Sequence, residues 1–291
     1  MINELVNIVT PVFTVIAVGY FWSKAGQKYD LDLVTSLVIN IGCPCLAFST
    51  LTDIRIDHSL LGQMGISTII AVTLFGLIGL VILRLAGLSP NAYLPPLMFA
   101  NIGNMGLPVC LFSYGSDGLA LAIIVFALVT IGQFAVGIWL YAGSFSQSGL
   151  HRNPVIISII ISLVILLTGI KTPEWISRPI RLLGEITIPM MLFTLGVCLA
   201  RMRVLNIRKA VLLSLTRIVM GFAVGVTVSY LMGLTGVVRG VLILQCSMPV
   251  AVFNYLLAER YRRKPEETAE LIVVSTLISL ISLPLVLIFL K

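Results

Sequence analysis

Apolar runs of about 20 residues, separated by short charged or Gly/Pro-containing stretches, fill the chain from end to end. A helix of that length spans the hydrocarbon core of a bilayer, which is about 30 Å thick. Of the 291 residues, 58% are hydrophobic and 11% charged, whereas soluble domains are about 45–50% apolar and about 25% charged. The pattern predicts an all-α integral membrane protein with ten transmembrane helices and argues against a water-soluble enzyme. The expected spans are residues 5–22, 31–51, 62–86, 93–114, 118–144, 154–170, 179–200, 209–233, 236–258 and 269–290.

The Lys and Arg residues fall in the short connections between the runs. Cytoplasmic loops carry an excess of Lys and Arg, so the side with more of them is expected to face inward. That side carries twelve of the 19, and the predicted outer side carries Arg55, Lys171, Arg178, Arg181, Arg239 and Lys291. We therefore predict that both termini lie outside. Because Glu4 precedes the first run and Lys24 follows it, we expect a retained first helix rather than a cleavable signal peptide.

The remaining composition offers little chemistry beyond the membrane. The net charge of +7 does not indicate nucleic acid, because no basic face interleaved with aromatic residues is present. Cys43 and Cys45 lack the spacing of a redox pair, and only two histidines are available to complete a metal site. We interpret the five cysteines as packing residues and expect no cofactor, no metal and no nucleic-acid partner.

The chain contains a weak internal repeat. Superposing Pro44 on Pro189 also aligns Asn40 with Glu185, Phe48 with Phe193, and Ser49 with Thr194. The next intramembrane prolines follow at similar spacings, Pro108 at 64 residues after Pro44 and Pro249 at 60 residues after Pro189. A chance coincidence of two spacings is the alternative explanation.

The repeat predicts the domain organisation. No linker divides the chain, so we expect residues 1–291 to form one membrane domain made of two five-helix repeats, 1–148 and 149–291. Because five is odd, the second repeat enters the membrane upside down. Such inverted repeats are common in secondary transporters, which move small solutes across a bilayer.

Two corresponding spans contain residues that weaken a helix at mid-membrane. The fourth holds Asn101, Asn104, Gly106 and Pro108, and the ninth holds Gln245, Ser247, Pro249 and Asn254. Backbone groups freed in hydrocarbon need partners, so such breaks persist only where protein or a water-filled cavity supplies them. We predict that these helices are broken at Pro108 and Pro249, with Gln245 opposite Asn104, and that all eight residues contribute to a substrate site. The alternative is two kinked helices whose amides form interhelical hydrogen bonds.

Charged and strongly polar residues inside the spans are few. An intramembrane charge is costly, so Arg217 is a candidate for the counter-charge of an anionic substrate, unless it extends to the cytoplasmic interface. Glu185 is a candidate to carry a coupling proton, or else forms a structural hydrogen bond. Gln133 and Thr130 are further coupling-ion candidates, with interhelical bonding as the alternative.

Three motifs resemble the auxin efflux carrier family. They are Asn101-x-Gly-Asn-x-Gly-x-Pro108 followed by Gly115-x-x-Gly118, the stretch Met248-Pro-Val-Ala-x-x-Asn-Tyr-x-x-Ala-Glu-x-Tyr261, and Ser279-Leu-Ile-Ser-Leu-Pro284. The resemblance covers essentially the whole chain. Plant members carry a long hydrophilic loop between the halves, whereas here that loop is only about residues 146–153. The chain therefore resembles a bacterial, malate-permease-like member.

The resemblance implies a fold similar to that of bile-acid symporters. Spans one, two, six and seven would form a scaffold that makes a homodimer, and the other spans a transport domain in which spans four and nine cross near the midplane. It also implies a small organic carboxylate as substrate, moved across the bacterial cytoplasmic membrane by an elevator-type movement.

Other functions are less favoured by the sequence. A sodium-coupled solute symporter is the first alternative, because the amides at the two breaks are neutral oxygen ligands for Na⁺, so either H⁺ or Na⁺ is a possible coupling ion. A membrane-embedded enzyme lacks a catalytic cluster, and a channel lacks a visible filter motif.

Overall fold

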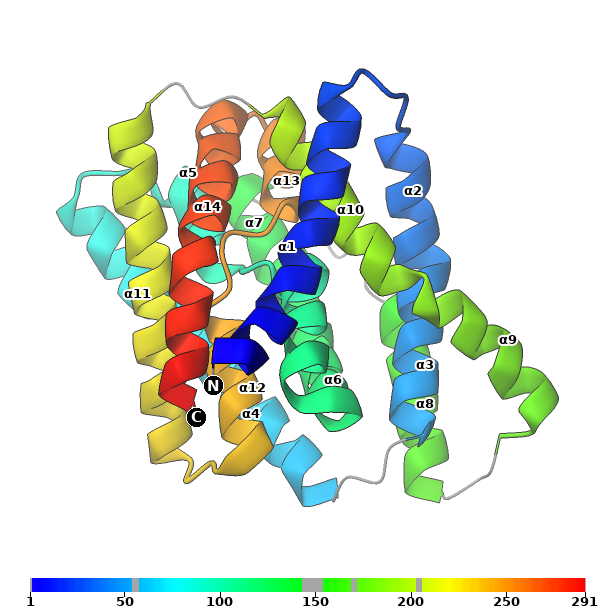
Figure 1. Ribbon diagram of the computed structural model, residues 1–291. Coiled ribbons are helices and arrows are strands. Elements are labelled where there is room, and N and C mark those ends of the chain that lie inside the picture. Colours follow the sequence, from blue (N-terminus) through cyan, green and yellow to red (C-terminus); the bar gives the residue numbers. More distant parts are fainter. Residues whose placement is uncertain (1, 54–57, 143–153, 169–171, 203–205, 291) are drawn as a thin grey trace.

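The computed structural model describes residues 2–53, 58–142, 154–168, 172–202 and 206–290, which are largely helical (Figure 1). In chain order the elements are α1 (Ile2–Lys24), α2 (Leu31–Leu37), the π-helical turn η1 (Val38–Gly42), α3 (Cys43–Asp53), α4 (His58–Leu85), α5 (Pro90–Met98), the π-helical turn η2 (Ile102–Gly106), α6 (Leu107–Gly132), the π-helical turn η3 (Gln133–Gly137), α7 (Ile138–Ala142), α8 (Pro154–Thr168), α9 (Glu174–Glu185), α10 (Thr187–Arg201), α11 (Ile207–Leu231), α12 (Gly236–Cys246), α13 (Phe253–Arg260) and α14 (Pro265–Leu290).

Several of these helices are long and apolar enough to cross a bilayer. Within the described residues six stretches qualify, namely Leu31–Thr52, Ser59–Leu85, Ile102–Ala142, Glu174–Arg201, Ile207–Leu231 and Pro265–Leu290. Shorter apolar helices lie at Ile8–Lys24 and Gly236–Cys246. The protein is therefore an all-helical, multi-pass membrane protein. The predicted boundary between repeats at residues 148 and 149 lies outside the described part of the chain.

The sequence predicted that the first break lies at Pro108, and this prediction is wrong. α5 ends at Met98, the chain becomes helical again at Ile102, and Pro108 is the second residue of α6. Pro108 follows the π-helical turn η2 without an interruption of the helix, and such a turn locally changes the hydrogen-bond ladder in which proline lacks a donor. The π-helical turn η2 directly precedes this proline, as η1 precedes Pro44 in α3.

The second break lies at residues 247–252, where the sequence predicted it, and Pro249 is inside it. The predicted superposition of Pro108 on Pro249 is consequently wrong, because only one of these prolines lies in a break. An isolated antiparallel β-bridge pairs Ala100 with Val250. By that pairing Asn104 corresponds to Asn254, four residues further on in each half, rather than to Gln245.

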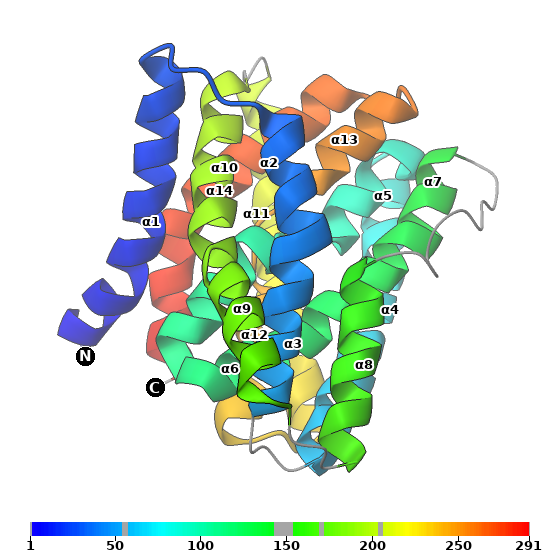
Figure 2. The same cartoon turned by 90° about the vertical axis from the view of Figure 1, so that its right-hand side faces the viewer.

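The helices pack as two groups, which lie side by side in Figure 1 and one in front of the other in Figure 2. The first helix group contains α1, α2, α3, α8, α9 and α10, in which α1 packs on α10 and α3 packs on α8 and α9. The second helix group contains α4 to α7 and α11 to α14, in which α11 packs on α12 and α14, and α12 packs on α6. Gly115 reverses the chain within α6 at φ 65° and ψ −152°, a conformation that favours glycine.

In the first helix group, glycines allow a close approach of α1 and α10. A Cβ atom at Gly196 would lie 2.0 Å from the carbonyl oxygen of Ile16, and one at Gly19 would lie 2.1 Å from that of Phe193. Both distances are far below van der Waals contact. Any larger residue at either position must therefore push the two helices apart.

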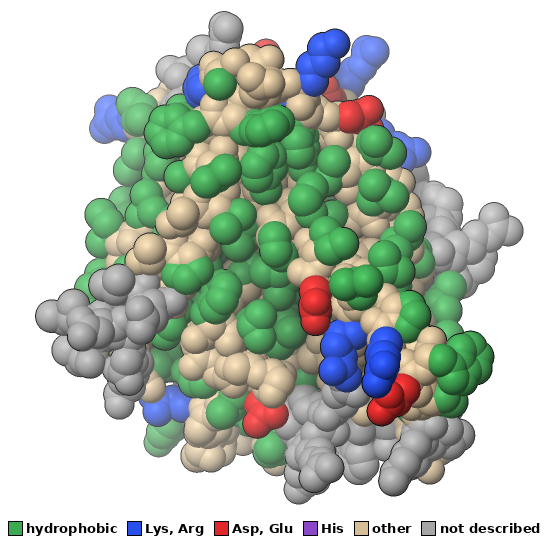
Figure 3. All heavy atoms as spheres, turned by 45° about the vertical axis from the view of Figure 1, so that its right-hand side comes forward, with side chains coloured by type: hydrophobic (Ala, Val, Ile, Leu, Met, Phe, Trp, Pro, Cys, Tyr) green, Lys and Arg blue, Asp and Glu red, His purple; other side chains and the backbone are tan. Residues whose placement is uncertain are grey.

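The surface is apolar around its middle and charged toward its ends. Figure 3 shows hydrophobic side chains across most of one face, with Lys and Arg gathered near its upper and lower margins. The upper end in Figure 1, where α1 and α10 end and α11 and α14 begin, is called the basic end. Its described cationic residues include Lys24, Lys28, Arg201, Arg208, Lys209, Arg260, Arg262, Arg263 and Lys264.

Candidate functional site

The two broken helices cross where their non-helical segments meet. The backbone N–H of Asn101 donates to the carbonyl of Pro249 at 2.7 Å, and the N–H of Ala251 donates to the carbonyl of Phe99 at 3.2 Å. In hydrocarbon every backbone polar group needs a partner inside the protein. The two breaks therefore satisfy each other, and we call residues 99–101 and 249–251 together the crossing.

Side chains from neighbouring helices complete the crossing. Asn254, which is fully buried, donates from Nδ2 to the carbonyl of Phe99 at 2.9 Å and accepts from Gln133 Nε2 at 3.3 Å. Ser275 of α14 accepts a hydrogen bond of 3.0 Å from the N–H of Val250. The sequence did not single out Ser275, because one serine in an apolar helix carries no signal of the segment against which it packs.

A cavity of about 660 Å³ lies between the two helix groups and ends on the crossing. From the first helix group it is lined by α2, η1, α3, α8 and α10, and from the second by η2, α6, η3, α13 and α14. Its walls are mainly apolar and include Phe126, Phe134, Phe253 and Met191. It extends to Arg201 and Glu266, which belong to helix ends at the basic end of the molecule.

The polar lining of this cavity comes mostly from residues that the sequence identified. Asn101, Asn104, Thr130 and Gln133 all line it, and Thr194 adds a hydroxyl from α10. Asn104 is partly exposed into the cavity and, within the described part of the chain, no side-chain hydrogen bond is formed by it. Its amide is therefore available to a ligand. Asn101 is buried, with its Nδ2 atom unpaired among the described residues.

The crossing has a positive and a negative face. The chain enters η2 at Ile102 and α13 at Phe253, and the segments around these two helix starts line the large cavity. The N–H groups of Ile102, Asn254 and Tyr255 are bonded to nearby carbonyls, so the positive charge of these two ends is that of the helix dipole. The helices that end at the crossing, α5 and α12, contribute Met98 and Cys246 to a separate cavity of about 20 Å³ behind it. The large cavity therefore faces two positive helix ends.

Arg217 and Gln245 belong to this small cavity and not to the large one. Arg217 is fully buried in α11 and donates from Nη2 to the carbonyl of Cys246 at 3.1 Å. It does not extend to the membrane interface, which was the alternative in the sequence analysis. Gln245 is buried against Gly106 of the other broken helix, and neither atom of its amide has a partner among the described residues.

The other predicted site residues lie at various distances from the cavity. Ser247 is buried in the second break, where its hydroxyl donates to the carbonyl of Ile243 at 2.7 Å. Pro108 is buried beneath η2. Glu185 is exposed at the junction of α9 and α10, away from the crossing. The structure thus joins Asn101, Asn104, Thr130 and Gln133 in one cavity and leaves Glu185 outside it.

At the basic end the cavity wall is tied to the loop between α1 and α2. Tyr29 shares a hydrogen bond of 2.6 Å with Thr194, and its carbonyl accepts from Arg201 at 2.9 Å. Burial raises the pKa of the Tyr29 hydroxyl above its ordinary value, so it stays protonated at neutral pH. This contact holds the loop beside the cavity.

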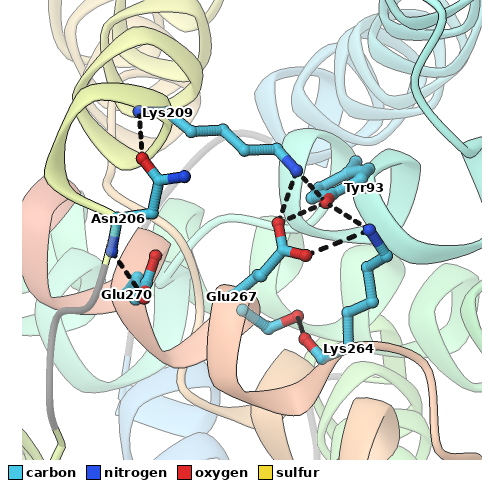
Figure 4. Close-up of polar contacts among 7 residues, drawn as sticks. Tyr93, Asn206, Lys209, Lys264, Glu267 and Glu270 are labelled. Carbon is cyan, nitrogen blue, oxygen red and sulfur yellow. Dashed lines mark hydrogen bonds and ion pairs between the residues drawn. The ribbon is translucent and has the colours of Figure 1, made fainter.

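A polar cluster ties the second helix group together at the same end (Figure 4). Glu267 of α14 lies between Lys209 at 2.5 Å and Lys264 at 3.0 Å, and Tyr93 of α5 donates to it. Hydrogen bonds to Tyr93 and Glu267 raise the pKa of Lys264. The cluster joins the starts of α5, α11 and α14 without lining the cavity.

Comparison with known proteins connects this architecture to membrane transport. A family described as membrane transport protein matches residues 140–287, which is just over half of the chain. An uncharacterized transporter of Methanocaldococcus jannaschii is 26% identical over 96% of each chain, and one of Methanothermobacter thermautotrophicus is 27% identical over 95% of each. Auxin efflux carrier component 1 of Arabidopsis thaliana is 30% identical over 45% of this chain and 22% of its own. This chain belongs to the auxin efflux carrier family of membrane transport proteins.

Proposed function

We propose that this membrane transporter is a secondary active carrier that moves a small organic anion across the cytoplasmic membrane. The observation that carries the proposal is the positive face of the crossing, where two helix starts and the free amide of Asn104 meet at the end of a large cavity. Helix N-termini attract anions because the positive end of the helix dipole lies there. No carboxylate needs to be neutralised first, because Glu266, the one described acidic residue that lines the cavity, belongs to the first turn of α14 at the basic end.

The shape and lining of the cavity indicate an amphipathic substrate. A volume of about 660 Å³ lies within the usual range of about 300–1,000 Å³ for small-molecule sites. The walls offer aromatic rings such as Phe126 and Phe134, whereas the polar groups converge at the crossing. An organic carboxylate would place its charged group at Asn101 and Asn104 and its apolar body against these rings.

The proposed architecture is ten membrane passes in two inverted repeats. The crossing supports it, because each break donates one backbone hydrogen bond to the other, as a two-fold axis in the membrane plane requires. Interruptions also occur at corresponding places before Pro44 and Pro189, at η1 and at the α9–α10 junction. In this scheme both termini lie outside and the cavity opens toward the cytoplasm at the basic end.

The proposed mechanism is an elevator-type movement of the second helix group against the first. The cavity lies between the two groups, so sliding one along the other would carry the crossing from one side of the membrane to the other. The first helix group would remain fixed as the scaffold, and we propose that it forms a homodimer.

The test measures binding to purified protein in lipid nanodiscs and uptake by proteoliposomes. Probes are benzoate, butyrate, succinate and malate, each with and without Na⁺. We expect Asn104→Ala to weaken binding of the best probe by roughly 10- to 150-fold, the effect of losing one hydrogen bond to a charged group. Its thermal stability should stay close to that of the wild type, because Asn104 makes no side-chain hydrogen bond within the described residues.

A matched control comes from Thr73, whose hydroxyl donates to the carbonyl of Ile69 on an exposed face of α4. Thr73→Ala should leave binding and uptake unchanged. Binding of no probe to the wild-type protein would contradict an organic-anion function. If a probe binds only when Na⁺ is present, even at a saturating probe concentration, the result would instead favour the sodium-coupled symporter.

A further inference from the structure

The small cavity behind the crossing holds a buried charge with few partners. Arg217 is 0% exposed and forms one hydrogen bond, from Nη2 to the carbonyl of Cys246. Its guanidinium also lies 4.7 Å from the ring centroid of Phe75. The Nε and Nη1 atoms have no partner among the described residues. Burying a guanidinium this way is costly, so its charge calls for an explanation.

Part of the explanation is the negative face of the crossing. Cys246 is the last residue of α12, and the final carbonyls of a helix carry a partial negative charge of about half an elementary charge. Arg217 therefore neutralises the end of α12. A full positive charge exceeds that half charge, so part of its field remains.

That remaining field reaches the large cavity through a thin wall. Ala100 and Ile102 line both cavities, so a single stretch of chain separates Arg217 from the site. One layer of chain with its side chains is about 10 Å thick, which we take as the order of the distance between Arg217 and an anion on the other face. Arg217 thus faces the anion site without touching it.

Other charges near the site are few among the described residues. Glu270 is buried, but it accepts from the N–H of Asn206 at 3.0 Å, at the start of α11. Asn206 precedes Arg217 by 11 residues, or about 16 Å along the helix at about 1.5 Å per residue. Arg201 and Glu266, which line the cavity near the basic end, carry opposite charges and are exposed to solvent.

We propose that Arg217 is a fixed counter-charge that acts through the crossing and sets the preference of the site for monovalent anions. The inference rests on the proposed function, since it concerns the same cavity. Two positive and two negative helix ends of about half a charge each meet at the crossing and cancel, so Arg217 leaves a net of about one positive charge there, which a monoanion balances. A dianion leaves one negative charge in a mostly apolar cavity, where an unpaired charge is unfavourable. Arg217 is therefore a positioning residue that selects the charge of the substrate and makes no contact with it.

The experiment compares ligands of one shape and different charge. Purified wild-type protein and Arg217→Gln are titrated with benzoate, which is monovalent, and with benzamide, its neutral analogue. A unit charge about 10 Å away at an effective dielectric constant of about 20 corresponds to roughly a 10- to 20-fold change in affinity. We expect Arg217→Gln to lower the affinity for benzoate by that factor and the affinity for benzamide by less than about threefold.

The outcomes separate this inference from the proposed function. If Arg217→Gln weakens the binding of benzoate and benzamide equally, Arg217 has a structural role and the counter-charge is overturned. The proposed function would still stand in that case, provided that the wild-type protein binds benzoate. If the wild-type protein binds neither these probes nor the carboxylates named above, the proposed function itself fails, and the counter-charge with it.

Two further measurements test the inference even if Arg217→Gln does not fold. Arg217→Lys keeps the charge with a different shape, so we expect its benzoate affinity to stay within about threefold of the wild type. On the wild-type protein, phthalate above pH 7 supplies a dianion on the same ring. Phthalate binding tighter than benzoate, or benzoate no tighter than benzamide, would overturn the proposal.

Discussion

Replacing Asn254 with alanine tests whether this buried amide supports the crossing or binds the ligand. The side chain is 0% exposed and does not line the large cavity. Asn254→Ala removes the 2.9 Å bond to the carbonyl of Phe99 and the longer 3.3 Å bond from Gln133. Phe99 keeps its bond from the N–H of Ala251, so its carbonyl is not left unpaired.

The expected cost follows from these contacts. Each lost hydrogen bond contributes about 0.5–1.5 kcal/mol, and interhelical bonds in membranes average near the lower end of that range. With the small void left by the amide, we expect the free energy of unfolding to fall by about 1.5–3 kcal/mol. For a chain of this size that corresponds to a decrease in Tm of roughly 3–10 °C.

The assay is unfolding in mixed micelles, followed by tryptophan fluorescence, together with a double-mutant cycle. Asn254→Ala, Gln133→Ala and the double variant should show a positive coupling energy of about 0.5 kcal/mol. Asn104→Ala, the corresponding position in the first half, is the control and should change stability by less than about 0.5 kcal/mol. Unchanged stability of Asn254→Ala with weaker ligand binding would refute the reasoning and place Asn254 in the site.

Two further predictions concern packing and charge. Gly196→Ala should lower the free energy of unfolding by about 1–3 kcal/mol, because its Cβ would lie 2.0 Å from a carbonyl oxygen of α1. Gly62→Ala, with no atom within 4 Å of the added Cβ, should be neutral or stabilise by up to about 1 kcal/mol; equal effects of the two would exclude helix crowding. Glu267 lies between two lysines, and its side chain is 30% exposed, so Glu267→Gln should lower the free energy of unfolding by about 0.5–1 kcal/mol. The loss should be smaller in 0.5 M salt, where the Debye length is about 4 Å. Glu174→Gln, in a pair that is 79% exposed on both sides, should change the unfolding midpoint by nothing measurable, and a cost there as large as at Glu267 would contradict the argument.

The lengths of the apolar runs predicted several of the helices, because membrane helices must be apolar over a fixed length. The predicted range 62–86 is α4 at His58–Leu85, and the predicted range 209–233 is α11 at Ile207–Leu231. The reversal expected between residues 114 and 118 occurs at Gly115. Each of these features depends on local chemistry, either the length of an apolar run or the freedom of a glycine.

The position of the first break was not predictable from the same rules. Pro108 has the stronger local signal, yet the chain leaves the helix at residues 99–101, where no glycine or proline occurs. Residues 99–101 are non-helical where residues 249–251 supply their hydrogen-bond partners from the other half of the chain. A long-range partner leaves no mark on the local sequence.

The candidate site was predicted in part for a related reason. Residue type identified Asn101 and Asn104 as polar groups at mid-membrane, and both line the cavity. Residue type alone did not separate them from Gln245 and Asn254, which are amides at similar depth but face other helices. The face of a broken helix that meets the cavity depends on the direction of the chain at the break, which only the crossing determines.

The crossing also has a consequence for how the protein is made. Residues 99–101 acquire their backbone partners only after the ribosome has added Val250, which lies about 150 residues after Ala100 in the chain. At roughly 5–20 residues per second of synthesis, that interval lasts about 8–30 s. During this time the first half lacks the partners that Pro249 and Ala251 supply, and neither water nor lipid would replace them if the crossing lies within the bilayer as proposed. We therefore expect the first half to depend on the translocation machinery, or on temporary partners, until the second half is made.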